Sequence, residues 1–213
     1  MDVIKLPASV TKADLRRVGD WLSAHCVSFP IGELNWRKQF PYAPQVQGRI
    51  GYNKEALFLQ FDVREKECRI VETRDNGPIW EDSCVEFFVQ PEANGGYYNF
   101  EFNAAGVLLL AYGKDRHSRV YASEEVLLSI ERHSCFLPTP DREGDCHWVL
   151  TARIPYAAFF NHLFSPDTTN CIKANFYKCG AKTRTPHFLS WHPVKTELPD
   201  FHRPEYFGTI IFR

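Results

Sequence analysis

A tryptophan and two carboxylates occur close together near the middle of the chain, in the run Trp80-Glu81-Asp82-Ser83-Cys84-Val85-Glu86. An indole ring can stack on the apolar C–H face of a pyranose, and the carboxylates of Asp82 and Glu86 can accept hydrogen bonds from its hydroxyl groups. These residues therefore suit the recognition of a sugar. The competing interpretation is that Trp80 is a buried core residue and that the two acids are solvated.

The same acids raise the alternative of glycoside hydrolysis. That reaction uses two carboxyl groups about 5–10 Å apart across the glycosidic bond. In a strand, Asp82 and Glu86 share a face but stand about 13 Å apart along it, which is too far. Glu101 belongs to a neighbouring predicted strand and could approach Glu86 more closely, so a glycoside-active enzyme stays an alternative.

Candidate cations lie in the last third of the chain. Lys178 and Arg184 could favour an acidic sugar or a phosphate, or they could form a solvated edge. Three histidines could in principle hold zinc, although such residues more often serve as neutral hydrogen-bonding groups: His187, His192 and His202. Loop carboxylates such as Asp75 and Asp82 are candidates for a structural calcium ion. No other cofactor is expected.

The overall composition is that of a folded globular protein. The chain has 213 residues, 44% of them hydrophobic and 24% charged, with a formal net charge of -1. Basic and acidic residues are interspersed, so neither nucleic acid nor an anionic membrane surface is an expected partner. The seven cysteines are scattered, with no C-x-x-C motif, and do not indicate a disulfide framework or a zinc site.

The N-terminal segment indicates the cellular compartment in which we expect the protein. Residues 1–7 lack the basic segment and apolar run of a secretory signal. No run approaches the roughly 20 apolar residues that span a bilayer. We expect a cytoplasmic protein, or a periplasmic or secreted one if a signal was removed. The oligomeric state is left open by the sequence.

Alternating and apolar runs predict most of the secondary structure. Residues 14–26 read as a short helix with Leu15, Val18 and Leu22 on one face, and residues 156–164 as one or two helical turns. Strands are predicted at 48–52, 56–63, 84–90, 97–103, 107–112, 126–132, 147–154, 171–179 and 207–212. Many strands without a repeating βαβ pattern indicate an all-β fold, an antiparallel β-sandwich of the immunoglobulin-like or jelly-roll type. We expect a single domain over residues 1–213, with residues 1–35 as a helical and irregular extension.

Several motifs together resemble one known family. In chain order they are Trp80-Glu81-Asp82-Ser83-Cys84-Val85-Glu86-Phe87-Phe88, Tyr98-x-Phe100-Glu101-Phe102-Asn103-x-x-Gly106, Ala174-Asn175-Phe176-Tyr177-Lys178, Ser190-Trp191-His192-Pro193 and Phe201-His202-Arg203-Pro204-Glu205-Tyr206-Phe207-Gly208. This order resembles the carbohydrate-binding module family 9-like domains, within the wider group of DOMON-like sandwiches. The resemblance runs from about residue 36 to the C-terminus.

The resemblance implies a β-sandwich that binds a sugar, often at its reducing end, between two tryptophans. It assigns these roles to Trp80 and Trp191, and it makes Glu86 a carboxylate that hydrogen-bonds the sugar. The chain departs from the family at Glu101, which stands where sugar-binding members can place a basic residue. It also departs at Phe188, where the spacing to Trp191 suggests a polar amide.

The sequence therefore predicts a non-catalytic protein that binds a mono- or oligosaccharide. The predicted ligand-binding residues are Trp80, Asp82, Glu86, Glu101, Trp191, Lys178 and Arg184. The alternative from a different class is a structural or protein-interaction sandwich that has lost the sugar site. His202, in the closing motif, is expected to hold its loop in place.

Overall fold

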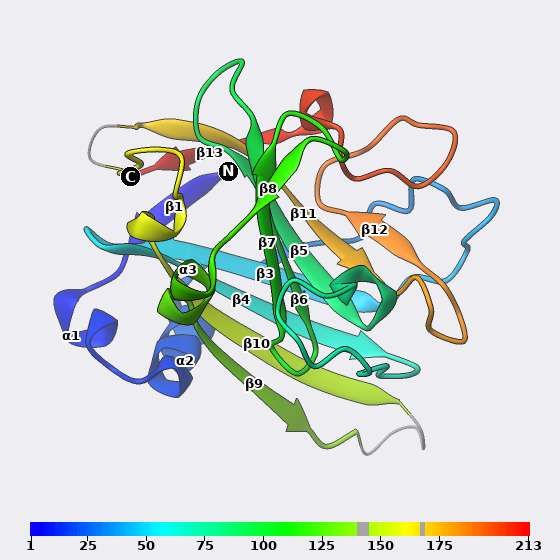
Figure 1. The fold of residues 1–213 in the computed structure, drawn as a ribbon. Helices are drawn as coiled ribbons and strands as arrows, with labels where there is room; N and C mark the ends of the chain where they lie inside the picture. The colour runs from blue at the N-terminus through cyan, green and yellow to red at the C-terminus, as the bar shows by residue number, and fades with distance from the viewer. Residues whose placement is uncertain (140–144, 167–168) are drawn as a thin grey trace.

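The computed structural model describes residues 1–139, 145–166 and 169–213. Its strands form one continuous sheet that folds back on itself as two facing layers (Figure 1). The first layer has the strand order β8 (Arg119–Tyr121), β7 (Leu108–Gly113), β6 (Tyr97–Asn103), β5 (Cys84–Gln90), β11 (Cys171–Cys179) and β13 (Gly208–Phe212), with β12 (Phe188–Ser190) paired to β11. The second has β3 (Gln45–Tyr52), β4 (Ala56–Glu65), β10 (Cys146–Pro155) and β9 (Glu131–Leu137), with β2 (Phe29–Pro30) paired to β3. The predicted β-sandwich is confirmed.

The N-terminal strand β1 (Asp2–Lys5) joins the two layers. It runs parallel to β13, where Asp2 lies opposite Ile211, and parallel to β3, where Ile4 lies opposite Gly51. The other strand pairs in the described part of the chain are antiparallel, for instance β5 with β6 and β3 with β4. Strand β1 therefore adds two parallel pairings to the predicted antiparallel β-sandwich.

The main core lies between the two layers. In β5 the inward residues are Val85, Phe87 and Val89, and in β6 they are Tyr98, Phe100 and Phe102. All six are fully buried. Since side chains alternate along a strand, Glu86 and Glu101 point to the opposite, outer face of the first layer.

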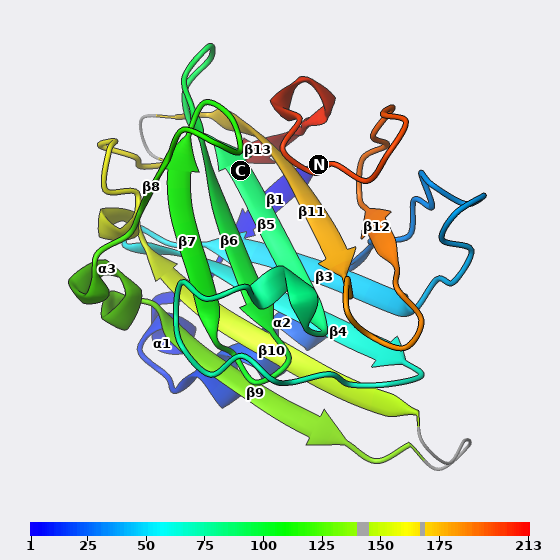
Figure 2. The ribbon, with the colours of Figure 1, turned by 45° about the vertical axis from the view of Figure 1, so that its right-hand side comes forward.

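Loops cover that outer face and form a second apolar cluster on it. The cluster includes Phe88, Tyr97 and Tyr177 from the strands, with Trp36 and Phe201 from covering loops. The link between β4 and β5 also crosses this face near the ends of β5 and β6, and it contains the short 3-10 helix η1 (Ile79–Glu81) (Figure 2). Two further 3-10 helices are η2 (Tyr156–Ala158) and η3 (Pro204–Tyr206).

The N-terminal helices lie against the other layer. Helix α1 (Ala8–Thr11) leads into α2 (Leu15–His25), whose buried face carries the predicted Leu15, Val18 and Leu22. Asp14 caps α2 because its side chain accepts a hydrogen bond from the backbone N–H of Arg17 at 3.1 Å. None of the helices in the described part of the chain has the length and apolarity needed to cross a membrane.

The predicted strand at 126–132 is wrong. This segment begins within α3 (Glu124–Ser129), and β9 (Glu131–Leu137) begins only at Glu131. Ser123 accepts a hydrogen bond from the backbone of Val126, and two glutamates occupy the first helical turn. The cap and these acids favour a helix here, over the weak alternation in the sequence.

Candidate functional site

A cavity of about 250 Å³ opens on the outer face of the first layer. Its lining comes from strands β5, β6, β8, β11 and β12, from η1, and from two connecting loops. The lining residues are Trp80, Glu86, Glu101, Arg116, Arg119, Cys179, Phe188, Pro199, Phe201 and His202. The structure thus brings Trp80 and Glu86, from one stretch of the chain, together with Glu101 from the next strand.

Two carboxyl groups, those of Glu86 and Glu101, form the floor of the cavity. Glu86 on β5 lies directly opposite Glu101 on β6. Both side chains are almost completely buried, at 2% and 3% exposure. The side-chain amide of Asn99 donates a hydrogen bond to Oε1 of Glu101 at 2.9 Å. Cross-strand partners have Cβ atoms about 5 Å apart, so the two carboxyl groups share one small volume.

Burial makes these carboxyl groups weak acids. It raises the pKa of Glu101 to about 7, against the opposing effects of Arg119, Asn99 and Arg116. Burial, and next the negative charge of Glu101, hold the pKa of Glu86 well above its ordinary value. Two facing carboxyl groups in an apolar setting therefore share protons at neutral pH, and each can accept or donate a hydrogen bond.

Two arginines lie at the rim of this floor. Nη1 of Arg119 is 3.9 Å from Oε1 of Glu101, and the Nε–H of Arg119 donates to the carbonyl oxygen of Arg116 at 2.9 Å. Arg116 in turn forms an ion pair with Asp200 at 3.0 Å. The rim is therefore cationic, but each guanidinium already has an acidic neighbour.

The walls are aromatic. The indole of Trp80 is 40% exposed, which leaves a large part of the ring free to meet a ligand. Phe201 is held in place by stacking on Tyr177, with ring centroids 4.1 Å apart, and it contacts Phe188 edge to face. His202 is anchored by a 2.9 Å hydrogen bond between its Nδ1 and the hydroxyl of Tyr97. Burial lowers the pKa of His202 to about 2, so this ring is neutral.

Asp82, one of the predicted sugar ligands, instead organises the loop ahead of β5. Its Oδ2 accepts hydrogen bonds from the backbone N–H groups of Val71 and Glu72, at 3.0 and 2.9 Å, and from the amide of Asn103 at 3.1 Å. Oδ1 lies 3.4 Å from Nε of Arg69. The side chain is 1% exposed and does not line the cavity.

We expect Asp82→Ala to lower the free energy of unfolding by about 1–3 kcal/mol, because backbone donors around it lose their acceptor. Chemical denaturation measures this change. Glu197→Ala removes an exposed carboxylate and should leave stability unchanged within about 0.5 kcal/mol. Equal stability of the two variants would contradict the structural role of Asp82.

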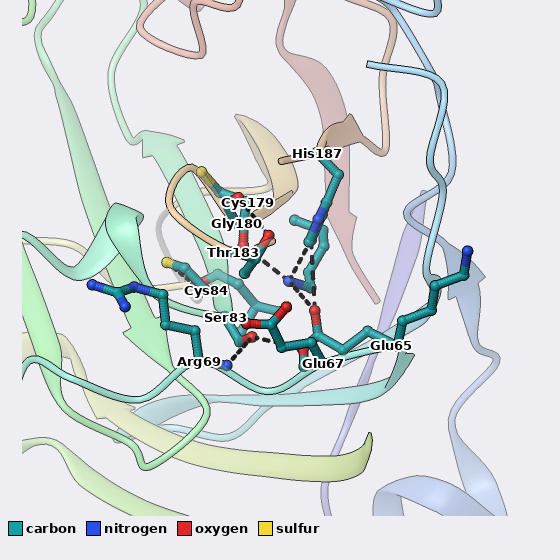
Figure 3. Close-up of polar contacts among 12 residues, drawn as sticks. Glu65, Glu67, Arg69, Ser83, Cys84, Cys179, Gly180, Thr183 and His187 are labelled. Atoms are coloured by element: carbon teal, nitrogen blue, oxygen red, sulfur yellow. Dashed lines mark hydrogen bonds and ion pairs between the residues drawn. The ribbon is translucent and has the colours of Figure 1, made fainter. Parts of the chain in front are cut away.

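Lys178 and Arg184 are not placed at the cavity. The amine of Lys178 lies 2.9 Å from Oε2 of Glu65, and both side chains have no exposed area. Figure 3 shows Glu65 and His187 converging. Lys178 lies on the core side of the first layer, because it alternates with the core residues Ala174 and Phe176 of β11. The side chain of Arg184 is 91% exposed and lies 3.8 Å from Glu67. Neither cation is available to a ligand in the cavity.

Trp191 packs on the main core and is separated from Trp80. Its ring centroid lies 5.8 Å from that of Phe29 and 5.7 Å from that of Phe176. Trp191 follows β12, and its backbone N–H donates to the carbonyl of Phe176 at 2.8 Å. It is absent from the cavity lining, so the predicted pair of stacking tryptophans is not assembled around this cavity.

Several lining residues escaped the sequence-based prediction. Arg116 and Arg119 lie in a segment in which no pattern was recognised. In the sequence, Phe188 stands out only as an apolar residue where the resemblance suggests an amide, and Phe201 only as part of the closing motif. The apolar residue at 188 was the one available signal of an aromatic side chain in the cavity wall.

Metal binding has no support in the described residues, where no three His, Cys, Asp or Glu side chains come together as a candidate ligand set. The two calcium candidates have other partners. Asp75 accepts two hydrogen bonds from Arg132 at 2.8 and 3.0 Å, and Asp82 is bonded as above. A structural calcium ion stays a prediction.

The comparisons with known proteins agree on one family. The family model described as carbohydrate-binding family 9 matches residues 20–212. A crystal structure from Bacteroides uniformis, described as that of a carbohydrate-binding protein, is 42% identical to this chain with a TM-score of 0.91, and the match covers 100% of this chain and 98% of that one. No curated protein matches the sequence.

Two more distant structures share the fold. Both are of a family 9 carbohydrate-binding module from Caldicellulosiruptor kristjanssonii, one in complex with cellotriose and one with glucose. The first has a TM-score of 0.62 at 10% identity and covers 100% of this chain and 93% of its own. The second has a TM-score of 0.58 at 12% identity and covers 100% and 95%. At this identity the likeness concerns the fold alone.

Proposed function

The chain belongs to carbohydrate-binding family 9, and from this premise we propose that it binds a mono- or oligosaccharide in the cavity beside Trp80. The observation that carries the proposal is an indole ring left 40% exposed at the edge of a cavity whose floor is polar and buried. A stacking plane next to convergent hydrogen-bonding groups is the combination that a pyranose requires.

In the proposed complex, the C–H face of the sugar lies on Trp80 and its hydroxyl groups point to the floor. Glu86 and Glu101 accept hydrogen bonds from these hydroxyls when ionised and donate when protonated. Phe188 and Phe201 provide the second aromatic wall, in the role that the resemblance gave to Trp191. Stacking contributes on the order of 1–3 kcal/mol and each charge-assisted hydrogen bond about 1.5–3 kcal/mol, before the cost of immobilising the ligand. Dissociation constants should therefore be micromolar to millimolar.

We expect Trp80→Ala to weaken sugar binding about tenfold or more, the equivalent of about 1.4 kcal/mol of stacking. Tryptophan fluorescence and calorimetric titration with glucose, cellobiose and related sugars measure the effect. Trp21→Ala is the matched control, because Trp21 lies on α2 against His25 and away from the cavity. A sugar that binds wild type and Trp80→Ala equally would remove this site from the proposal.

Glycoside hydrolysis is the second candidate function, and the pair of weak acids on the floor is the observation that favours it. We nevertheless propose that the protein is non-catalytic, because of where these two acids lie. Glu86 and Glu101 are neighbours on adjacent strands of one floor, whereas glycosidases place their two carboxyl groups on either side of the scissile bond. If the wild-type protein hydrolysed an aryl glycoside and Glu86→Gln abolished that activity, the protein would be an enzyme and this proposal would be wrong.

A further inference from the structure

Two buried oxygen atoms on the outer face of β6, one of them on a residue that lines the cavity, have no hydrogen-bond partner among the described residues. They are Oε2 of Glu101 and Oδ1 of Asn99, whose side chains are 3% and 0% exposed. An acceptor left unsatisfied in a buried position costs about 1–3 kcal/mol, and more when it is charged. A ligand that brings hydrogen-bond donors into the cavity would remove this cost.

The charges around the floor are not balanced. The guanidinium of Arg116 is paired with Asp200 at 3.0 Å, and Arg119 approaches Glu101 at 3.9 Å. None of the ion pairs within the described part of the chain includes Glu86. The floor can therefore take up one further positive charge when both carboxyl groups are ionised. His202 supplies none, because burial lowers its pKa to about 2.

We propose that the cavity selects a sugar bearing a free, protonated amino group, with the ammonium placed between Glu86 and Glu101 and the pyranose ring on Trp80. This inference rests on the proposed function and narrows it to amino sugars. An ammonium group carries three donors and no acceptor, which matches a floor with two carboxyl groups, one of which has an unpaired oxygen. Charge-assisted hydrogen bonds are about twice as strong as neutral ones.

The geometry favours an amino sugar over a bare inorganic cation. The described residues contain no cluster of three ligating side chains, so a metal ion would find only two carboxylates at the floor. The half-exposed indole and the phenylalanine walls instead match the carbon skeleton of a sugar. An N-acetylated amino sugar has no positive charge, so the protein should not prefer it over glucose.

The test is calorimetric titration with glucose, glucosamine and N-acetylglucosamine at pH 7.5 and low ionic strength, above the pKa of about 7 of Glu101. We expect wild type to bind glucosamine at least tenfold more tightly than glucose, and N-acetylglucosamine no more tightly than glucose. In Glu86→Gln and Glu101→Gln the preference for glucosamine should fall below threefold. Trp80→Ala should weaken glucose and glucosamine alike and so preserve their ratio. Glu197→Gln, an exposed change of the same charge, should keep the preference intact.

The outcomes separate this inference from the proposed function. Binding of neutral sugars without a preference for glucosamine overturns the inference and leaves sugar binding in place. A preference that survives both glutamine substitutions also overturns it, since the ammonium would then lie elsewhere. Binding of none of the three sugars, nor of cellobiose, by folded wild-type protein overturns both. Circular dichroism confirms that each variant is folded.

Discussion

Replacing Lys178 by methionine is expected to lower the free energy of unfolding by about 3–5 kcal/mol, the usual cost of breaking a buried ion pair from one side. The amine of Lys178 contacts Oε2 of Glu65 at 2.9 Å, the carbonyl of Cys179 at 2.9 Å and Nε2 of His187 at 2.8 Å. Without the lysine, the fully buried Glu65 would keep its charge with no cation beside it, or it would have to take up a proton.

The state of His187 follows from the same contacts. Its Nδ1 is 2.9 Å from the carbonyl oxygen of Thr185, which only accepts, so Nδ1 must carry the proton. Nε2 is then free to accept a hydrogen bond from Lys178. Burial, and next the charge of Lys178, lower the pKa of His187 to about 3, which agrees with a neutral ring. The 3.6 Å approach of His187 to Glu65 is therefore not an ion pair.

A double substitution separates the charge from the packing. Glu65→Gln keeps an acceptor for the indole N–H of Trp148, which donates to Oε1 of Glu65 at 2.7 Å, but removes the charge. We expect Lys178→Met with Glu65→Gln to recover at least half of the loss, measured by urea denaturation. Lys38→Met, which removes an exposed lysine, should change little. A loss below about 1 kcal/mol for Lys178→Met alone would contradict the buried pair.

The sequence contains a signal for this pair that becomes clear only with the structure. In β11, Lys178 continues the alternate positions of Ala174 and Phe176, which face the main core. In β4, Glu65 continues the positions of Phe61 and Val63, which face the same core. A cation on one apolar face and an anion on the facing one must pair, because either charge alone would be buried without a partner. Alternation along β11 by itself places Lys178 on the core face, which disagrees with its prediction as a ligand-binding residue.

Alternation and adjacency explain why part of the candidate site could be predicted. Glu86 and Glu101 lie on the outer face because apolar neighbours fix the inner one, and the short link between β5 and β6 makes them adjacent. Trp80 enters the cavity because η1 directly precedes β5. These relations are local in the chain, and the strand pattern determines them.

Tertiary placement explains what could not be predicted. Trp191 and Phe201 both lie in the C-terminal loops, and both have apolar residues near them in the sequence. Only the folded chain sends the first to the main core, against Phe29, and the second to the outer face, against Tyr177. Asp82 likewise reads as a free carboxylate until the loop before it supplies two backbone donors.

Glu101→Gln is expected to stabilise the protein at alkaline pH, by about 3 kcal/mol at pH 8. Burial raises the pKa of this carboxyl group from an ordinary 4.5 to about 7 in the folded protein. Between these two values the folded state holds a proton that the unfolded state has released, so stability falls as the pH rises through this window. Above it the whole penalty of a buried charge is present. Glutamine has the shape of the protonated acid and avoids that penalty.

The pH dependence of this difference distinguishes a buried acid from a simple gain in packing. Denaturation of wild type and Glu101→Gln from pH 4 to 8.5 should give equal stabilities at the acid end, a gap that widens between pH 4.5 and 7, and a plateau above. Glu197→Gln should show no such gap. A difference that is constant over the whole range would contradict the buried acid. The expected gap also has a functional meaning, because a carboxyl group kept at such a cost to stability serves the cavity and not the fold. The variant that is more stable at pH 8 should therefore be the one that has lost the preference for an amino sugar.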